Sequence, residues 1–338
     1  MKEYFGTLPS GEEVFLYTIS SGNLTAAITD GGATLVRLLV PDANGNVADV
    51  VLGHDNMEGY VNGSGFLGAI VGRNANRIHN AAFTLNGREY KLTPNEKTHN
   101  LHSGPDVFHT RLWTVEEWTQ NSITLRLDSP DGDQGYPGNA VIRVTYLLDN
   151  QDTLHIIYDG DCDKETVFNL TNHSYFNLAG QENTAAAMKQ TLSMPARFFN
   201  PDDAENIPTG ELRSIEGSPM DFRVPKPIGQ DIDAAYEPLQ LQGGYDHNFE
   251  VFTDPCAILS DPESGRTMAV STDLPGVQFY SGNYLDLHGK GGVYYGRRSG
   301  ICLETQFYPD SVNHPEWPQP FVKAGTHYHS RTKFHFTF

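Results

Sequence analysis

The side chain best suited to chemistry is that of His173, which lies in an apolar and aromatic stretch, NLTNHSYFNL (169–178). This composition favours a buried β-strand, in which every polar side chain needs a hydrogen-bond partner. His173 is therefore either a core histidine with satisfied hydrogen bonds or a general acid or base in a buried site.

The second such side chain is that of Glu304, in the strand-like stretch SGICLETQF (299–307). Because side chains alternate between the two faces of a strand, Glu304 is expected on the same face as Cys302 and Gln306. A carboxylate held in a partly buried polar cleft has a raised pKa and suits a general base. The alternative is an exposed strand residue with no such role.

Other polar residues occur in similar settings: Arg77 in GRNANRI, His102 in NLHSG, and Asp246 beside His247 in GYDHNF. No motif indicates another familiar chemistry. The chain has no HExxH, GxSxG, Walker loop, GxGxxG that opens a helix, or CxxC pair.

Two stretches have some features of metal sites. The segment SPDGDQGYPG (129–138) contains two of the aspartates of a calcium loop but lacks its closing glutamate, so it is interpreted as a turn. His327, His329 and His335 occupy alternate positions of the last strand. They are interpreted as surface or strand-face histidines rather than as a metal cluster.

The elements that must position these side chains are predicted to be short strands. Runs rich in Val, Ile, Thr, Leu and aromatic residues, such as VFLYTIS (14–20), alternate with turn clusters along the chain. Asn86-Gly87 predicts a two-residue hairpin turn, and helical periodicity is limited to one short candidate around 231–241. The pattern predicts an all-β protein, a large antiparallel β-sandwich with very little helix, in which residues 1–338 form a single domain.

Two long irregular segments, 93–110 and 200–230, interrupt this pattern. Structureless stretches of such length inside a compact domain are commonly functional loops, and we interpret both in this way.

The charge balance restricts the partners. With 23 Lys and Arg against 42 Asp and Glu, the formal net charge is −19. Such a field repels phosphate backbones and anionic lipids, so nucleic acid, membranes and phosphorylated substrates are disfavoured, and a neutral or cationic small molecule is favoured. The same charge also serves solubility by itself.

Compartment is predicted from the cysteines and the hydropathy. Cys162, Cys256 and Cys302 are widely separated and form neither a zinc pattern nor a disulfide framework, which predicts a reducing, cytoplasmic compartment. No segment approaches the roughly 20 apolar residues of a membrane span.

Seven motifs, in order between residues 72 and 306, together resemble those of the aldose 1-epimerases, also called galactose mutarotases: GRNANRI, NLHSG, SPDGDQGYPG, TNHSYFNL, GYDHNF, VQFYSGN and ICLETQ. The resemblance covers most of the chain and implies the β-sandwich of that family. It also implies interconversion of the α and β anomers of free aldohexoses such as D-galactose and D-glucose. The implied partner is a small monosaccharide, with no cofactor and no metal, and both a monomer and a homodimer are compatible with it.

The resemblance also implies a mechanism. Opening a cyclic hemiacetal requires a base that removes the proton of the anomeric hydroxyl and an acid that protonates the ring oxygen. At the matching motif positions, Glu304 is the implied base and His173 the implied acid, facing each other across the sugar. The open aldehyde then rotates about its C1–C2 bond and closes as the other anomer.

The implied substrate-binding residues come from the same motifs. His102 would orient the sugar near its reacting end, and Phe279 or Tyr280 would supply an apolar platform, with Phe279 taken as the site residue because only one can face the cleft. Ser103 stands where many family members have a glycine, which is expected to affect the loop but not the histidine. The residues expected to bond sugar hydroxyls are Asn76, Arg77, Asp246 and Gln278.

Three other functions stay open. A non-catalytic carbohydrate-binding β-sandwich would bind sugars without accelerating anomer exchange. A metal-dependent jelly-roll enzyme would use His102, His173 and Glu304 as ligands. An epimerase of hexose 6-phosphates is disfavoured by the acidic balance and by the lack of an evident Arg/Lys cluster near the motifs.

Overall fold

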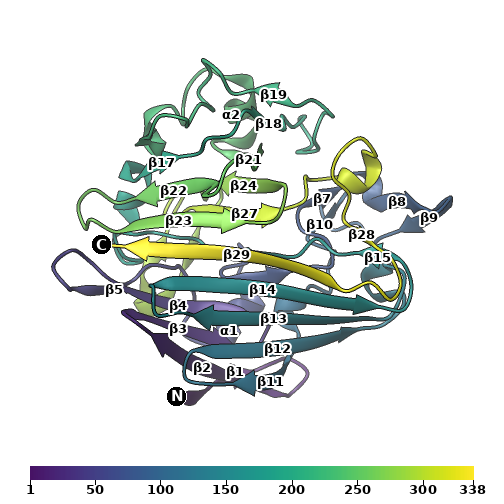
Figure 1. Ribbon diagram of the computed structural model, residues 1–338, viewed down its shortest axis with the longest axis horizontal. Coiled ribbons are helices and arrows are strands. Elements are labelled where there is room, and N and C mark those ends of the chain that lie inside the picture. The colour runs from purple at the N-terminus through teal and green to yellow at the C-terminus, as the bar shows by residue number, and fades with distance from the viewer.

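Alternating apolar residues build the largest sheet of the computed structural model, which describes residues 1–338. On β12 (Ser122–Ser129) and β13 (Ala140–Leu148), buried residues alternate with more exposed ones, as in a sheet with one covered face. The C-terminal strand β29 (Tyr328–Thr337) lies between β14 (Thr153–Cys162) and β23 (Thr267–Thr272), so it joins strands from distant parts of the sequence (Figure 1). The other seven strands of this nine-stranded antiparallel sheet are β11 (Thr114–Trp118), β14 (Thr153–Cys162), β29 (Tyr328–Thr337), β23 (Thr267–Thr272), β22 (Ala257–Ser260), β17 (Thr191–Ser193) and β20 (Lys226–Pro227).

A five-stranded antiparallel meander at the N-terminus packs against part of this sheet. Residues of both sheets, such as Ile28, Leu38 and Val144, belong to one hydrophobic cluster of 54 buried residues. The hydroxyl of Tyr146 crosses this core and donates to the carbonyl of Ala33 at 2.7 Å. The strands of the meander are β1 (Lys2–Thr7), β2 (Glu13–Ser21), β3 (Leu24–Thr29), β4 (Thr34–Pro41) and β5 (Val47–Asp49).

A second five-stranded antiparallel sheet lies beside the larger one and carries three of the polar motifs. Its strands, in spatial order, are β19 (Arg213–Ser214), β18 (Phe198–Phe199), β21 (Asp246–Glu250), β24 (Gly276–Tyr280) and β27 (Cys302–Gln306). The remaining strands form two-stranded antiparallel pairs: β6 (Ala69–Val71) with β16 (Thr171–His173), β7 (Arg77–Ile78) with β10 (Asn100–Leu101), β8 (Ala82–Leu85) with β9 (Arg88–Lys91), β15 (Thr166–Val167) with β28 (Phe321–Val322), and β25 (Leu287–His288) with β26 (Tyr294–Tyr295).

Helix is scarce, and the prediction of an all-β sandwich with very little helix is confirmed. The two α-helices, α1 (Met57–Asn62) and α2 (Glu237–Gln242), have six residues each, and α2 overlaps the C-terminal half of the predicted helical candidate. Neither helix has the length or apolarity needed to cross a bilayer. The short 3₁₀ segments are His79–Ala81, Phe108–Thr110, Asp133–Gly135, Thr184–Lys189, Ile228–Gln230, Lys290–Gly292 and Ser311–Asn313.

The predicted hairpin turn is confirmed. Asn86 and Gly87 connect β8 to β9 and both have positive φ angles, 52° and 76°. A two-residue turn with both central residues in the left-handed region matches the twist of its strands, which explains the Asn-Gly pair.

The expected strand over 169–178 is mostly wrong, because only Thr171–His173 pairs as a strand. Its asparagine side chains bond to the backbone of neighbouring segments and replace a regular ladder. Asn169 accepts from the amide of Phe307 at 2.9 Å, and Asn172 donates to the carbonyl of Gly68 at 2.9 Å. The stretch is buried as expected, but it is an irregular connection pinned by side-chain amides.

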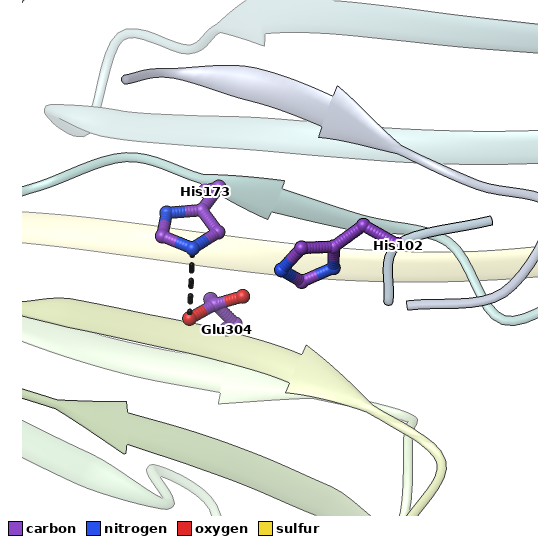
Figure 2. A group of neighbouring side chains, drawn as sticks. All are labelled: His102, His173 and Glu304. Carbon is purple, nitrogen blue, oxygen red and sulfur yellow. Dashed lines mark ion pairs between the residues drawn. The ribbon is translucent and has the colours of Figure 1, made fainter. Parts of the chain in front are cut away.

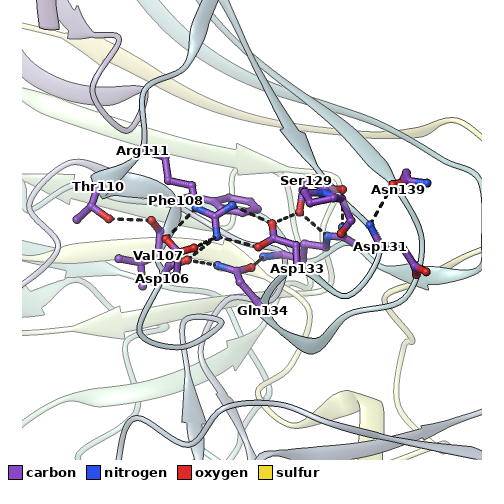
Figure 3. A network of polar contacts seen from close by, with 12 residues as sticks. Asp106, Val107, Phe108, Thr110, Arg111, Ser129, Asp131, Asp133, Gln134 and Asn139 are labelled. Carbon is purple, nitrogen blue, oxygen red and sulfur yellow. Dashed lines mark hydrogen bonds and ion pairs between the residues drawn. The ribbon is translucent and has the colours of Figure 1, made fainter. Parts of the chain in front are cut away.

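The segment 129–138 is a turn, as predicted, and its aspartates bind protein groups (Figure 3). Asp133 accepts two hydrogen bonds from the guanidinium of Arg111, at 2.8 and 2.9 Å. Gln134 donates to the carbonyl of Asp106 at 2.7 Å. The turn therefore holds the irregular segment 93–110, which carries His102.

Arg73 fixes the other side of this turn. Its side chain is fully buried and donates to the carbonyls of Ser129, Pro137 and Gly138 at 2.7 to 2.9 Å. A guanidinium has five N–H donors in a rigid fork, so one side chain can satisfy several buried carbonyls at once.

Replacement of Arg73 tests this arrangement. We expect Arg73→Leu to lower the free energy of unfolding by about 3–5 kcal/mol, because the carbonyls it satisfies would stay buried without a donor. Urea unfolding followed by circular dichroism measures the change. Arg126→Leu is the matched control, since Arg126 is bonded to surface carboxylates and its loss should cost at most about 1 kcal/mol. Equal effects of the two substitutions would contradict this account.

Candidate active site

A cavity of about 350 Å³ gathers seven of the eight residues that the sequence analysis assigns to the site. They come from separate motifs that the fold brings together at the end of the second five-stranded sheet and under the irregular segments. The residues that line the cavity are Gly65, Phe66, Asn76, Arg77, Glu96, Leu101, His102, His173, Tyr175, Asn206, Asp246, Gln278, Tyr280, Tyr284 and Glu304.

Three neighbouring strands supply the floor. Gln278 of β24 pairs in register with Glu304 of β27, and its side-chain amide donates to Asp246 of β21 at 2.8 Å. Strand alternation places Glu304 on the polar face, as predicted. The same alternation places His247 away from the cavity, fully buried against Phe199.

The prediction that Phe279 lines the site is wrong. Its ring is fully buried in the main hydrophobic cluster, stacked on Tyr245 with the ring centroids 4.8 Å apart. Tyr280, the next residue on β24, lines the cavity in its place. Consecutive residues of a strand face opposite ways, and here the polar face of β24 is that of Gln278 and Tyr280.

His173 and Glu304 are immediate neighbours. The Nε2 atom of His173 lies 3.7 Å from Oε1 of Glu304, and both side chains are buried (Figure 2). The expectation that they face each other across the sugar is therefore wrong, because this distance leaves no room for a ring. The anomeric oxygen and the ring oxygen are both bonded to C1, so two adjacent groups can reach them from one side.

Burial disfavours the charged forms of both His173 and Glu304. Desolvation lowers the pKa of His173 to about 4. Desolvation also raises the pKa of Glu304 well above its usual range, and the Asp246 carboxylate raises it further. Burial therefore favours the neutral imidazole of His173 and the protonated carboxyl of Glu304, which places the proton of the free pair on Glu304.

His102 lies beside this pair (Figure 2), and a backbone amide fixes its ring. Its Nδ1 accepts from the amide of Asn76 at 3.1 Å, which leaves the proton of the neutral ring on Nε2. Burial lowers the pKa of His102 well below its usual value. His102 is therefore a neutral hydrogen-bond donor toward the cavity.

The segment around His102 has an unusual backbone. Asn76, His102 and Ser103 all have positive φ angles, 62°, 51° and 69°. Ser103, the departure from the family pattern, accepts from the amide of Asn74 at 2.8 Å through its hydroxyl. This bond ties the loop of His102 to that of Asn76 and offsets the cost of a left-handed serine.

Arg77 is oriented by a carboxylate that the sequence analysis missed. Glu96 accepts from Nε and Nη2 of Arg77 at 2.5 and 2.9 Å. Burial alone would lower the pKa of Arg77, but this ion pair raises it. The Nη1 group is not engaged by Glu96 and can donate to a ligand.

Some cavity residues that were not predicted individually lie in segments that the sequence indicated as functional loops. Glu96 and Leu101 lie in the irregular segment 93–110, and Asn206 lies in 200–230, the two segments interpreted as functional loops. Nothing in the sequence indicated Phe66, whose ring stacks near His173 with centroids 5.8 Å apart. Cys302 is a further neighbour, since its sulfur lies 3.6 Å from Nδ1 of His173.

The geometry also allows metal binding. Ligand atoms of His102, His173 and Glu304 lie within 4.8 Å of one another, and two histidines with a carboxylate form a common set of metal ligands. The arrangement of the cavity thus permits acid and base catalysis by the side chains themselves or by a bound ion.

Comparison with known proteins identifies relatives along almost the whole chain. Residues 16–335 match the family model described as aldose 1-epimerase. The chain is 41% identical to a galactose mutarotase of Bos taurus over 98% of its length and 97% of the relative, and 40% identical to an aldose 1-epimerase of Haemophilus influenzae over 97% of each. The crystal structure of an aldose epimerase homologue from C. elegans superposes with a TM-score of 0.89 at 30% identity, covering 95% of this chain and 98% of that one.

The contrasting positions of Phe279 and Tyr280 lead to a stability test. Phe279→Ala is expected to lower the free energy of unfolding by about 3–5 kcal/mol because it leaves a cavity in the core. Tyr280→Phe keeps the aromatic ring and is expected to change the free energy of unfolding by less than about 1 kcal/mol. Urea denaturation of both variants measures the difference, and a Phe279→Ala variant as stable as the wild type would place Phe279 outside the core.

Proposed function

The chain belongs to the aldose 1-epimerase family and interconverts the anomers of free aldoses, and we propose that Glu304 and His173 carry the proton transfers of this reaction. The observation that carries the proposal is the contact of these two buried groups, 3.7 Å apart, in a cavity rich in hydrogen-bonding side chains. The substrates that we infer are free aldohexoses such as D-galactose and D-glucose.

The reaction moves one proton in each direction. In the free pair burial keeps the proton on Glu304, so this proton first passes to His173 across their contact. Glu304 then removes the proton of the anomeric hydroxyl while His173 protonates the ring oxygen, the C1–O5 bond breaks, and the C1 aldehyde forms. After rotation about C1–C2, the O5 hydroxyl adds to the other face of the aldehyde and returns its proton to His173, as Glu304 reprotonates O1. The pair holds one proton before and after each turnover, so no other acid or base is consumed.

The remaining polar groups suit a neutral, polyhydroxylated ring. Asp246 accepts, Arg77 and His102 donate, and the amide of Gln278 does both, so hydroxyls on several ring carbons find partners. Burial raises the pKa of Asp246, and Arg77 and Gln278 limit that rise. The half-buried Tyr280 replaces Phe279 as the aromatic surface beside the sugar. Fixed positions of this kind reduce the entropy lost on reaching the transition state.

We further propose that residues 1–338 act as one domain in a reducing, cytoplasmic compartment. Support for one domain comes from the 54-residue cluster, which includes side chains from Tyr17 to Phe336. Support for the compartment comes from Cys162, Cys256 and Cys302, which are buried and unpaired.

Removal of either group should abolish most of the catalysis. We expect Glu304→Gln and His173→Asn to reduce turnover by about 10² to 10⁴ each, while circular dichroism shows an intact fold. Polarimetry on freshly dissolved α-D-galactose and α-D-glucose, with EDTA present, measures the approach to equilibrium. Near-normal turnover in both variants would overturn the assignment.

The same assay separates the other functions. Sugar binding without faster anomer exchange would indicate a carbohydrate-binding sandwich. Activity that EDTA abolishes and a divalent metal restores would show that His102, His173 and Glu304 bind a catalytic ion.

The single shared proton predicts a bell-shaped pH profile. Below about pH 4 His173 takes up a proton, so the pair holds two and no base is left. At high pH Glu304, whose pKa burial raises, loses the shared proton and no acid is left. After subtraction of the uncatalysed rate, kcat/KM should be constant between these limits and fall on both sides. A fall that begins near neutral pH on the acidic side would contradict this model.

A further inference from the structure

A second group of potential metal ligands lies on the outer face of the nine-stranded sheet, away from the cavity. It comprises Asp159 and Asp161 on β14, His329 on β29, and His327, which immediately precedes β29. Asp159 pairs in register with His329, and the histidines are about half exposed. Because side chains two residues apart share a face of a strand, all four point outward together.

The contacts within this group converge on one oxygen atom. Oδ1 of Asp159 lies 2.9 Å from Nε2 of His327 and 2.9 Å from Nδ1 of His329. Two ligands of an ion with bonds of ~2.1 Å lie roughly 2.9 to 3.4 Å apart, depending on the coordination geometry. These atoms are therefore already spaced as neighbouring ligands.

Asp161 contacts the ring nitrogen of His327 that faces away from Asp159. Its Oδ1 accepts from Nδ1 of His327 at 2.9 Å, which directs the other ring nitrogen, Nε2, toward Asp159 and His329. A carboxylate that holds the far nitrogen of a metal-binding histidine is a recurrent outer contact of metal sites. Without a metal, His327 can donate from both nitrogens only as an imidazolium, and an ion would replace the proton on Nε2.

Charge favours a cation here. Arg143 pairs in register with Asp159 on the neighbouring strand, but its guanidinium is bonded to Glu116 at 2.7 Å and lies 3.6 Å from Asp161. The Asp159 carboxylate contacts His327 and His329 instead. The formal net charge of −19 adds a general attraction for cations. His335, further along β29, bonds to Thr153 at 3.1 Å and is not part of the group.

We propose that Asp159, His327 and His329 bind one divalent transition-metal ion of the Zn²⁺ or Ni²⁺ class, with Asp161 orienting His327. Two imidazoles and one carboxylate suit these ions better than Mg²⁺ or Ca²⁺, which prefer oxygen ligands. The ion would link β14 to β29 and stabilise the folded chain by mass action. The histidines lie on the exposed face of the strand, as interpreted from the sequence, and the proposal adds Asp159, which the sequence did not place beside them.

Isothermal titration of the protein with Ni²⁺ and with Zn²⁺ tests the proposal, with protein that carries no affinity tag and has been freed of metal by a chelator. We expect one ion per chain, a loss of affinity of at least tenfold in His327→Gln and in His329→Gln, and a loss of about 10- to 100-fold in Asp161→Asn. His335→Gln is the matched control on the same strand and should bind as the wild type does. Mutarotation of the surface variants should be unchanged, which shows that they are folded.

The cavity offers a competing site, so His173→Asn is titrated in parallel. Unchanged binding in His173→Asn together with lost binding in His329→Gln supports the surface site. Binding that is lost in His173→Asn, or that persists in both His327→Gln and His329→Gln, overturns it. No binding to the wild type at millimolar metal overturns it as well.

Discussion

The contact between the imidazole of His173 and the carboxylate of Glu304 depends on two segments that are far apart in the sequence. Glu304 lies on β27, the edge strand of a five-stranded sheet, whereas His173 lies on the three-residue strand β16. Burial disfavours both the imidazolium of His173 and the carboxylate of Glu304, and their proximity allows one proton to pass between them. The packing of the sandwich around both segments is therefore the condition for the chemistry.

Hydrogen bonds between side chains and backbone, more than regular strands or helices, fix the polar residues around the pair. Asn76 binds His102, Ser103 binds Asn74, and Arg73 satisfies the carbonyls of the neighbouring turn. Such connections can adopt backbone conformations that a strand cannot, including the positive φ angles at Asn76 and His102. The sheets supply rigid positions for the floor of the cavity, and this network gives comparable order to its walls.

Carboxylates have three different roles in this acidic chain. Glu304 is buried in the cavity, where we propose that it transfers protons, Glu96 orients Arg77, and Asp159 converges with two histidines on the outer face. What separates these roles is the partner and the degree of burial, because burial changes the pKa of a carboxylate while an exposed one keeps its charge and can attract a cation. Net charge by itself would not have distinguished them.

Local order was determined by the sequence alone. Alternation in ICLETQ placed Glu304 on a polar face, and Asn86-Gly87 specified the turn of a hairpin, because both depend only on residues adjacent in the chain. Periodicity and turn clusters were enough for the all-β class, and the ordered motifs were enough for the family.

Tertiary structure decided everything that depends on residues distant in sequence. Alternation stated that Phe279 and Tyr280 face opposite ways, but only the packing of Tyr245 on Phe279 shows which of them faces the core. The asparagines of 169–178 ended the expected strand because their partners, such as Phe307, come from remote segments. Asp159 and His329 are 170 residues apart and meet only because β14 and β29 are neighbours in the sheet. Side-chain types and local periodicity are written in the sequence, whereas the partner of each polar group is set by which strands become adjacent.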